Sequence, residues 1–326
     1  MKDGKYSLGK IGVLMGGYSS EREISLKSGK AVYEALKQES CDVIGIDIVE
    51  KTHEDIKERI RGSHIDVAFI ALHGRLGEDG EIQTILGELD IPYTGSSAVA
   101  SRNAFDKAVT QKILRENNIP IPPFTVLSKF QSADKDLLRK IGPVPVVVKP
   151  ACEGSSIGVT IVKAKEDLLA ALNLAWKYGD TILVEKFIEG REVTVGILNG
   201  QVLPIIEIKP NRPFFDFVAK YNKGETEYVI PAGLPKTVAA RIQEMALAAF
   251  QATGCAGMAR IDFMLDSKNR PYALEINTIP GFTATSLLPM AAKHVGKTFG
   301  QLCLELTKSA YGKETKQNRE SIPVKS

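Results

Sequence analysis

The sequence predicts an α/β protein of three domains, the first of which is built on a parallel sheet. In the first hundred residues, apolar strands alternate with helices, a pattern that is typical of a parallel sheet covered on both faces. Three prolines between positions 120 and 123 end this pattern, and a strand-rich stretch follows. At 326 residues, the chain also exceeds one ordinary hydrophobic core. We expect domains over residues 1–95, 96–189 and 190–326.

The first domain is predicted to contain three strands and three helices. The expected strands are residues 11–17, 43–49 and 66–72, and the expected helices are residues 19–38, 52–62 and 80–90. Ser20 and Glu23 have the spacing of a capping box at the start of the first helix. Ligands of such sheets bind where the carboxyl ends of strands meet loops, which here are GGYSSE (16–21) and HGRLGEDG (73–80).

The second and third domains mix strands with fewer helices. One helix is expected from about Ala98 to Asn117, before the prolines. The strands expected after it are residues 124–127, 144–150, 158–162 and 181–188, with a helix at 166–179. The last domain is predicted to contain strands at 191–198 and 203–208, a helix at 236–254, a hairpin and a final helix.

Composition excludes several classes of protein. Apolar residues make up 44% of the chain and charged residues 25%, as in a soluble globular protein. The net charge of +3 is too small to favour a nucleic-acid or membrane-surface partner. No apolar run reaches the roughly 18 residues of a spanning helix, and the first residues lack a signal-peptide core. The four scattered cysteines are expected to be free thiols in a cytoplasmic protein.

The predicted hairpin at residues 259–277 brings acidic side chains together. ARIDFML and PYALEIN are expected strands, joined by a DSKN turn. Because side chains alternate along a strand, Asp262 and Glu275 are expected on one face. That face also carries Arg260 and Asn277, and the residues expected behind it are Leu274 and Ile276. Two carboxylates and an amide, without His or Cys, favour Mg²⁺ held jointly with phosphates. The alternative is a polar face on a surface hairpin.

Two further segments have features of a nucleotide site. Lys149 ends an apolar strand, and the loop at residues 153–158 is rich in glycine and serine, whose N–H and hydroxyl groups suit phosphate oxygens. This loop could be a lid over a nucleotide triphosphate or a plain hairpin turn, and the sequence at this point does not decide between the two. Glu185 ends another apolar strand, where it could accept from an adenine amino group. The residues expected around the adenine and ribose are Phe187, Ile188 and Glu192, although an ordinary strand end would also fit.

Nine segments form a consistent series along the chain. They are GGYSSEREIS, HGRLGEDG, PYTGSS followed by Asp106-Lys107, VVVKP, EGSSIGV, VEKFIEGRE, FFDFVAKY, GCAGMARIDFMLD and LEINTIPGFTATSLLP. In order and approximate spacing, they resemble the D-alanine–D-alanine ligases of the ATP-grasp superfamily, from about Lys10 to Thr307. The resemblance implies a three-domain ATP-grasp fold, with ATP held between the second and third domains.

The resemblance also implies a role for individual residues. The residues matching the ATP contacts are Lys107, Lys149, Glu185, Lys186, Phe187, Ile188 and Glu192. Those matching the ligands of two Mg²⁺ or Mn²⁺ ions are Asp262, Glu275 and Asn277. Those matching catalytic groups are Glu21, His73, Ser155, Lys220, Tyr221, Arg260 and the backbone N–H of Gly281. Among the residues matching substrate contacts, Glu21 matches the partner of the first D-alanine's ammonium, and His73 lies at the substrate end of the site. Ser286 and Leu287 match the residues that receive the second D-alanine's carboxylate.

The activity implied by the resemblance has two steps. The carboxylate of one D-alanine attacks the γ-phosphoryl group of ATP, and the amine of a second D-alanine then displaces phosphate from the acylphosphate. Such a reaction needs oriented cations and donors more than a protein nucleophile. The family implies a cytoplasmic enzyme of peptidoglycan synthesis, a homodimer, and activation by K⁺ as an option. Phenylalanines in FFDF (214–217) and the pair Ala151-Cys152 depart slightly from the family's common pattern.

Three rival functions remain at this point. A D-alanine–D-lactate ligase is the nearest, and the residue at Tyr221 tracks that choice, with tyrosine resembling the dipeptide-forming class. Another ATP-grasp carboxylate–amine ligase fits less well, because GGYSSE and HGRLGEDG match the amino-acid end of the site. A non-catalytic ATP sensor would be expected to lack some of the residues matched to the metal ligands and to Arg260.

Overall fold

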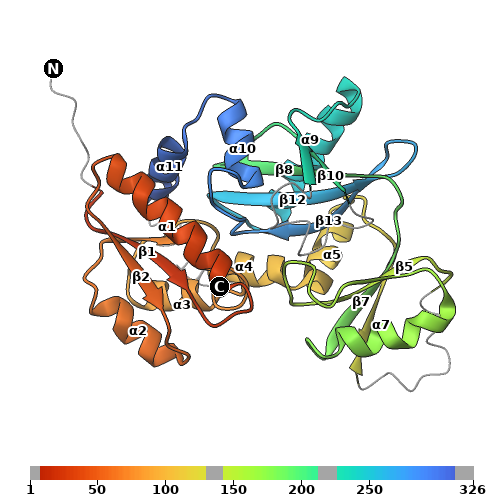
Figure 1. The fold of residues 1–326 in the computed structure, drawn as a ribbon, viewed down its shortest axis with the longest axis horizontal. Coiled ribbons are helices and arrows are strands. Elements are labelled where there is room, and N and C mark those ends of the chain that lie inside the picture. Colours follow the sequence, from red (N-terminus) through yellow and green to blue (C-terminus); the bar gives the residue numbers. More distant parts are fainter. Residues whose placement is uncertain (1–7, 130–141, 212–225, 313–326) are drawn as a thin grey trace, which may run out of the picture.

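The computed structural model describes residues 8–129, 142–211 and 226–312. Lys220, Tyr221 and the segment FFDF (214–217) lie outside these ranges. The described strands form three sheets of three, six and four strands. Figure 1 shows the three-stranded sheet at one end, the four-stranded sheet at the other, and the six-stranded sheet between them. This arrangement agrees with the predicted α/β class.

The N-terminal sheet is parallel and has the order β2-β1-β3, as the alternating pattern predicted. Its strands are β1 (Ile11–Gly16), β2 (Val43–Ile48) and β3 (Val67–Ile70), and its helices are α1 (Arg22–Gln38), α2 (His53–Arg61) and α3 (Glu81–Glu88). The predicted capping box of Ser20 and Glu23 is wrong. Glu21 occupies the N-cap of α1 and no side chain caps the helix, because the Glu21 carboxylate bonds to a distant loop instead.

The single helix predicted between Ala98 and Asn117 is two helices, α4 (Ala98–Phe105) and α5 (Lys107–Glu116). Asp106 separates them with ψ 104°, an extended conformation that no α-helix continues through. Its carboxylate accepts from the N–H groups of Ala108 at 2.9 Å and Val109 at 3.2 Å, so it starts α5 as an N-cap. This break fixes the direction in which Lys107, at the first position of α5, leaves the backbone.

The four-stranded sheet is antiparallel, with the order β4-β7-β5-β6. Its strands are β4 (Phe124–Ser128), β5 (Val146–Pro150), β6 (Thr160–Val162) and β7 (Thr181–Lys186). The helix predicted at 166–179 is shorter, consisting of a 3₁₀ turn η2 (Lys165–Asp167) and α7 (Leu168–Ala175). Leu168, Leu172 and Ala175 of α7 pack on this sheet in a separate hydrophobic core.

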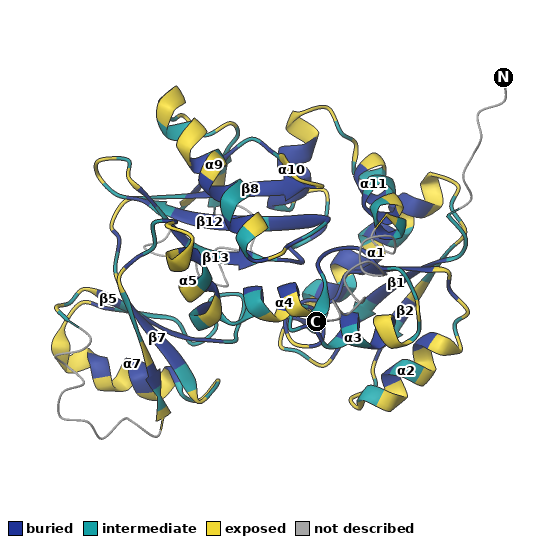
Figure 2. Cartoon of the chain, turned by 180° about the vertical axis from the view of Figure 1, so that it is seen from behind, coloured by how far each residue is buried: buried dark blue, intermediate teal, exposed yellow. Residues whose placement is uncertain are grey.

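The six-stranded sheet has the order β11-β10-β8-β12-β13, and β9 pairs with β8. Its strands are β8 (Arg191–Leu198), β9 (Gln201–Val202), β10 (Ile206–Pro210), β11 (Thr226–Val229), β12 (Met258–Leu265) and β13 (Pro271–Asn277). The remaining helices are α9 (Lys236–Ala252), α10 (Leu287–His294) and α11 (Phe299–Tyr311). Figure 2 shows β8 and β12 as largely buried, whereas α2, α7 and α9 expose their outer faces.

The predicted hairpin is β12–β13, and its register differs in detail from the prediction. The loop has five residues, 266–270, rather than the four of DSKN. A β-bulge after Asp262 compensates for the extra residue, so that Asp262 still lies opposite Glu275, and Arg260 opposite Asn277. The bulge moves Leu274 out of the position predicted behind the hairpin, and its side chain lines a cavity on the other face. Ile276 packs in the core, as expected.

The largest hydrophobic core joins the N-terminal sheet to the C-terminal helices. Phe282 is fully buried and its ring lies 5.5 Å from those of both Phe69, on β3, and Phe299, on α11. The loop that carries Phe282 is therefore anchored in the N-terminal sheet, although it follows β13 of another sheet. The domain boundaries predicted at residues 95 and 189 stay predictions.

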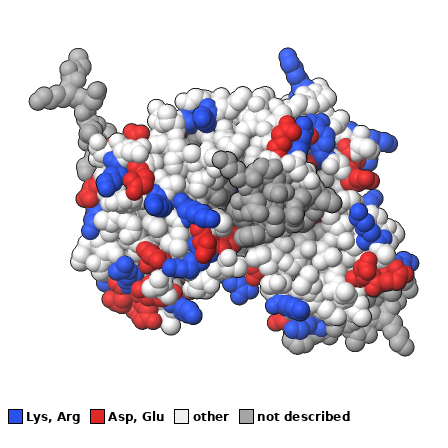
Figure 3. All heavy atoms as spheres, in the orientation of Figure 1, with Lys and Arg blue, Asp and Glu red and all other residues white. Residues whose placement is uncertain are grey.

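Two properties of the described residues are their surface charge and the apolar character of their helices. On the face seen in Figure 3, basic and acidic side chains lie intermixed rather than gathered by sign. Among the described helices, none has the length and apolar character needed to span a bilayer.

We predict that Asp106→Ala lowers the free energy of unfolding by about 1 kcal/mol, because the N-terminal amides of α5 lose their acceptor. In a chain of this size, that corresponds to a thermal midpoint lower by about 1–2 °C. Asp106→Asn is the control, since its amide oxygen keeps the cap, and it is expected to melt close to the parent. Equal midpoints for Asp106→Ala and the parent would contradict the assigned cap.

Candidate functional site

Two adjoining cavities of about 500 Å³ and 530 Å³ lie where loops of the three sheets converge. Three residues line both cavities, namely Lys107, Glu153 and Glu275. We call the first the amino-acid cavity and the second the nucleotide cavity, after the groups that the sequence predicted at each. The predicted residues lining the amino-acid cavity are Glu21, His73, Ser155, Arg260, Asn277, Gly281, Ser286 and Leu287. Those lining the nucleotide cavity are Lys149, Glu185, Lys186, Phe187, Ile188, Glu192 and Asp262.

Glu21 joins the N-terminal sheet to the glycine–serine loop. Its carboxylate is 6% exposed and accepts a hydrogen bond from the Ser155 hydroxyl, which comes from a residue 134 positions away. Two glycines make room for it. A Cβ atom at Gly74 would lie 2.9 Å from Glu21 Oε2, and one at Gly154 would lie 2.7 Å from the same atom. A side chain at either position would displace this carboxylate, so the two glycines let the HGRLGEDG and EGSS loops close on it in its present position.

Two more carboxyl groups border the amino-acid cavity. Burial raises the pKa of the Glu78 carboxyl, and the neighbouring Glu21 raises it further, while a hydrogen bond with His73 lowers it. Burial also raises the pKa of Glu153, against the opposing charge of Arg75, whose guanidinium lies 3.5 Å away. Both shifts have the direction expected when carboxyl groups share a dry site. Such an arrangement favours a ligand that brings a positive charge.

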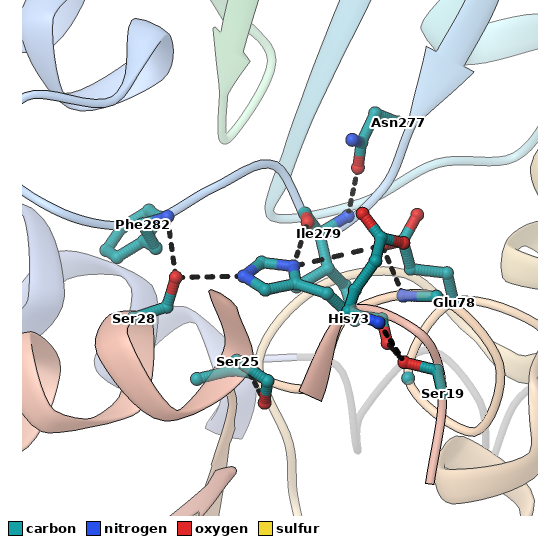
Figure 4. Close-up of polar contacts among 12 residues, drawn as sticks. Ser19, Ser25, Ser28, His73, Glu78, Asn277, Ile279 and Phe282 are labelled. Atoms are coloured by element: carbon teal, nitrogen blue, oxygen red, sulfur yellow. Dashed lines mark hydrogen bonds and ion pairs between the residues drawn. The ribbon is translucent and has the colours of Figure 1, made fainter. Parts of the chain in front are cut away.

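His73 ties the N-terminal sheet to the loop after β13 (Figure 4). Its Nδ1 lies 3.0 Å from the carbonyl oxygen of Ile279, and its Nε2 lies 2.9 Å from the Ser28 hydroxyl. The carbonyl can only accept, so Nδ1 donates. Both ring nitrogens therefore have protein partners, although the ring, 4% exposed, still lines the cavity. The contact of His73 with a substrate stays a prediction.

The carboxylates of β12–β13 are partly neutralised by two cations. The Arg260 guanidinium donates to both oxygens of Asp262, at 2.9 Å and 2.7 Å. The Lys107 ammonium lies 3.5 Å from a carboxylate oxygen of Glu275. Thr194 on β8 also donates to Asp262 Oδ1, at 2.6 Å. The two cations formally balance the two carboxylates, so a metal ion would be favoured here mainly together with the negative charge of bound phosphates.

These oxygens fit a divalent cation that also binds phosphates. A carboxylate has about four acceptor positions, and Arg260 and Thr194 use three of those of Asp262. Asn277 Oδ1 accepts from the N–H of Ile279 at 3.0 Å and keeps a second lone pair. Within the described ranges, no three His, Cys, Asp or Glu side chains are placed so that they alone could hold a metal ion. A metal held here would therefore need phosphate or water oxygens to complete its shell, as Mg²⁺ commonly does.

The nucleotide cavity contains a buried ion pair with one unpaired atom. Lys149 Nζ lies 2.7 Å from Glu185 Oε2, and the two side chains are 8% and 3% exposed. Glu185 Oε1 is buried without a hydrogen-bond partner among the described residues. A buried carboxylate oxygen in this state is costly unless a donor meets it. A ligand N–H group entering the cavity would supply that donor.

Several residues of the site were not predicted from the sequence. They are Ser28, Glu78, Thr194 and Glu207, and they line a cavity or bond to a predicted residue. Arg191 lowers the pKa of Glu207 through a hydrogen bond at 2.7 Å. Glu78 lies in HGRLGEDG, a loop that the sequence already predicted to carry a ligand site, and this was an available signal. Ser28, inside α1, carried no comparable signal in the sequence.

Models of two parts of one protein family match most of the chain. The model described as D-ala D-ala ligase N-terminus matches residues 10–54 and 49–96. The model described as D-ala D-ala ligase C-terminus matches residues 113–308. Together they include most of the residues that line the two cavities, although Lys107 lies between the two matched ranges.

Individual relatives agree with these models. The D-alanine–D-alanine ligase of Syntrophotalea carbinolica is 47% identical over 293 residues, which are 90% of this chain and 93% of that protein. A crystal structure of D-alanine–D-alanine ligase from Bacillus anthracis complexed with ATP is 34% identical, with a TM-score of 0.84 over 95% of this chain and 99% of that one. The VanG D-Ala:D-Ser ligase of Enterococcus faecalis is 29% identical, with a TM-score of 0.79 over 93% and 99%. The chain belongs to the D-alanine–D-alanine ligase family.

Proposed function

We propose that this protein joins two D-alanines into D-alanyl-D-alanine at the expense of ATP, through an acylphosphate. The observation that carries this proposal is the pair of adjoining cavities that share Lys107, Glu153 and Glu275. One cavity is bordered by carboxyl groups suited to an ammonium, and the other contains the cation and unpaired acceptor suited to a nucleotide. A phosphoryl group at their junction could pass from one ligand to the other without crossing solvent.

In the first step, the carboxylate of one D-alanine attacks the γ-phosphoryl group of ATP, and ADP leaves. Glu21 would hold the ammonium of this D-alanine, and Ser155 would keep that carboxylate oriented. Lys107 and Lys149 would meet the phosphate oxygens, where charge increases in the transition state. Lys220 and Tyr221, which lie outside the described residues, keep their proposed roles at the transferred phosphoryl group and in the closing contact.

In the second step, the amine of another D-alanine attacks the acyl carbon and phosphate leaves. The carbonyl oxygen becomes an oxyanion, for which Arg260 and the Gly281 N–H group would be the donors. Ser286 and Leu287 border the same cavity and would receive the carboxylate of the second D-alanine. The hydroxyl of Ser286 already accepts from the N–H of Thr283 at 3.0 Å, which orients it at the start of α10.

We also propose the cofactors and the setting. Asp262, Glu275 and Asn277 would hold two Mg²⁺ or Mn²⁺ ions, which neutralise phosphate charge when bound. Three further proposals follow from the family alone. They are activation by K⁺, a homodimer formed through the N-terminal domain, and a cytoplasmic enzyme that serves peptidoglycan synthesis.

The direct test is release of ADP by purified protein with ATP and Mg²⁺, with and without D-alanine. We expect release only with D-alanine, and a product with the mass of the dipeptide. Competition with D-serine and D-lactate tests the choice of second substrate, and D-alanyl-D-alanine is expected to dominate at neutral pH. An equal rate of ADP release with and without D-alanine would contradict the proposal.

We predict that Glu275→Gln lowers turnover by about a hundredfold or more, because the developing phosphate charge loses a metal-binding carboxylate. Thermal unfolding is expected to change little. Glu227→Gln is the matched control, since Glu227 lies on β11 of the same sheet with a 66% exposed side chain and faces Lys209. Near-parental turnover in Glu275→Gln would show that this face does not hold the metals.

We predict that Glu185→Gln weakens ADP binding by about tenfold to a hundredfold, because the ligand loses a charged acceptor and Lys149 loses its partner. Titration calorimetry measures the affinity, and the D-alanine concentration at half-saturation is expected to stay within about twofold. Glu166→Gln, an exposed change in η2 of the same part of the chain, serves as the control. An unchanged ADP affinity would place the adenine elsewhere.

A further inference from the structure

The loop between β13 and α10 is held by two N-terminal side chains. Its Ile279 carbonyl accepts from His73 Nδ1 at 3.0 Å, and its Phe282 N–H donates to the Ser28 hydroxyl at 3.2 Å. The Ser28 hydroxyl in turn lies 2.9 Å from His73 Nε2. Figure 4 shows these contacts as one chain running from α1 through His73 to the loop. The two ends of a four-residue segment are therefore bound to the N-terminal sheet and its helix.

With a neutral His73 ring, the hydrogen atoms in this chain of contacts have one consistent arrangement. His73 Nδ1 donates to a carbonyl, so in the neutral ring Nε2 carries a lone pair and accepts from the Ser28 O–H group. The Ser28 oxygen is then available to accept from the Phe282 N–H group. Ser28 is 1% exposed and His73 is 4% exposed, so water is a poor substitute for either partner.

These contacts bracket one peptide plane. The Ile279 carbonyl belongs to the peptide before Pro280, and the Phe282 N–H belongs to the peptide after Gly281. Between them lies the peptide of Pro280 and Gly281, which carries the Gly281 N–H group. Pro280 has a fixed φ, whereas Gly281 can rotate freely unless its following peptide is held. Ser28 holds that peptide, and the buried ring of Phe282 fixes the residue beyond it.

We propose that Ser28 is a positioning residue, whose hydroxyl orients the Gly281 N–H group toward the oxyanion of the second chemical step. The proposal rests on the proposed ligase function. It assigns to α1 a part in the chemistry beyond the ammonium contact of Glu21, which lies two turns earlier on the same face. Ser28 itself touches no reacting atom in this role and acts through the loop and through His73.

The test compares Ser28→Ala with Ser25→Ala. Ser25 lies one turn earlier on α1, is fully buried and also makes two hydrogen bonds, from Gly16 N–H and to the Ala71 carbonyl, both at 2.8 Å. Each variant thus loses a buried hydroxyl of the same helix, but only Ser28 touches the loop. The quantities measured are kcat, the KM values for ATP and D-alanine, thermal unfolding, and the ADP released per dipeptide formed.

We expect Ser28→Ala to lower kcat by about tenfold or more, as small displacements of catalytic groups do, with the KM for ATP unchanged. The ratio of ADP to dipeptide should rise above one, because slower attack by the amine leaves the acylphosphate more time to react with water and return D-alanine and phosphate. Ser25→Ala should keep the parental kcat and a ratio of ADP to dipeptide of one, even if its thermal unfolding midpoint falls.

Parental kcat and a ratio of one in Ser28→Ala would overturn the proposal, as would equal changes in both variants. If Ser28→Ala does not fold, Ser28→Cys is measured instead. Its thiol is a weak donor and acceptor, so we expect a smaller change in the same direction. A parental ratio of ADP to dipeptide in Ser28→Cys would overturn the proposal. Failure of the proposed function is a separate result, because the parent itself would then release no ADP with D-alanine.

Discussion

The pairing of Asp262 with Glu275 across β12 and β13 is the constraint around which the site is organised. Two carboxylates at neighbouring positions repel each other, so the fold has to bring cations to them. Arg260 on the same strand and Lys107 at the start of α5 supply part of that charge. In the proposed function, metal ions and the phosphates that they accompany would bind at this face, where both cavities meet at Glu275. The bulge after Asp262 keeps this pairing despite a five-residue loop.

A second requirement is that groups from distant parts of the chain meet in one cavity. Loops from the N-terminal sheet bring Glu21 and His73 to one side of the amino-acid cavity, and the EGSS loop brings Ser155 to the other. The shared core around Phe282 holds the N-terminal sheet and the loop after β13 in one arrangement. An acylphosphate formed between these elements would be shielded from water, which is what a two-step ligation needs.

Much of this could be predicted from the sequence, and the rest could not for identifiable reasons. Strand and helix periodicity predicted the parallel N-terminal sheet and the acidic face of β12–β13, because both depend on local alternation of side chains. The helix break at Asp106 was missed, since an Asp inside an apolar pattern is compatible with a helix and with a cap. The bulge that moves Leu274 was missed because it depends on the length of the loop between β12 and β13, which has five residues rather than the predicted four. Ser28 carries no local signal, because a serine inside a helix acquires meaning only from the His73 and Phe282 groups that tertiary folding brings to it.

The central claim is that the oxygens on this face of β12 and β13 hold the metal ions that accompany the nucleotide. Crystals grown with Mn²⁺ and a non-hydrolysable ATP analogue test it through the anomalous scattering of manganese. The account predicts two peaks beside Asp262, Glu275 and Asn277, at about 2.0–2.2 Å from their oxygens and from the phosphate oxygens. Manganese peaks bound to the phosphates with none of these three side chains in contact would contradict it.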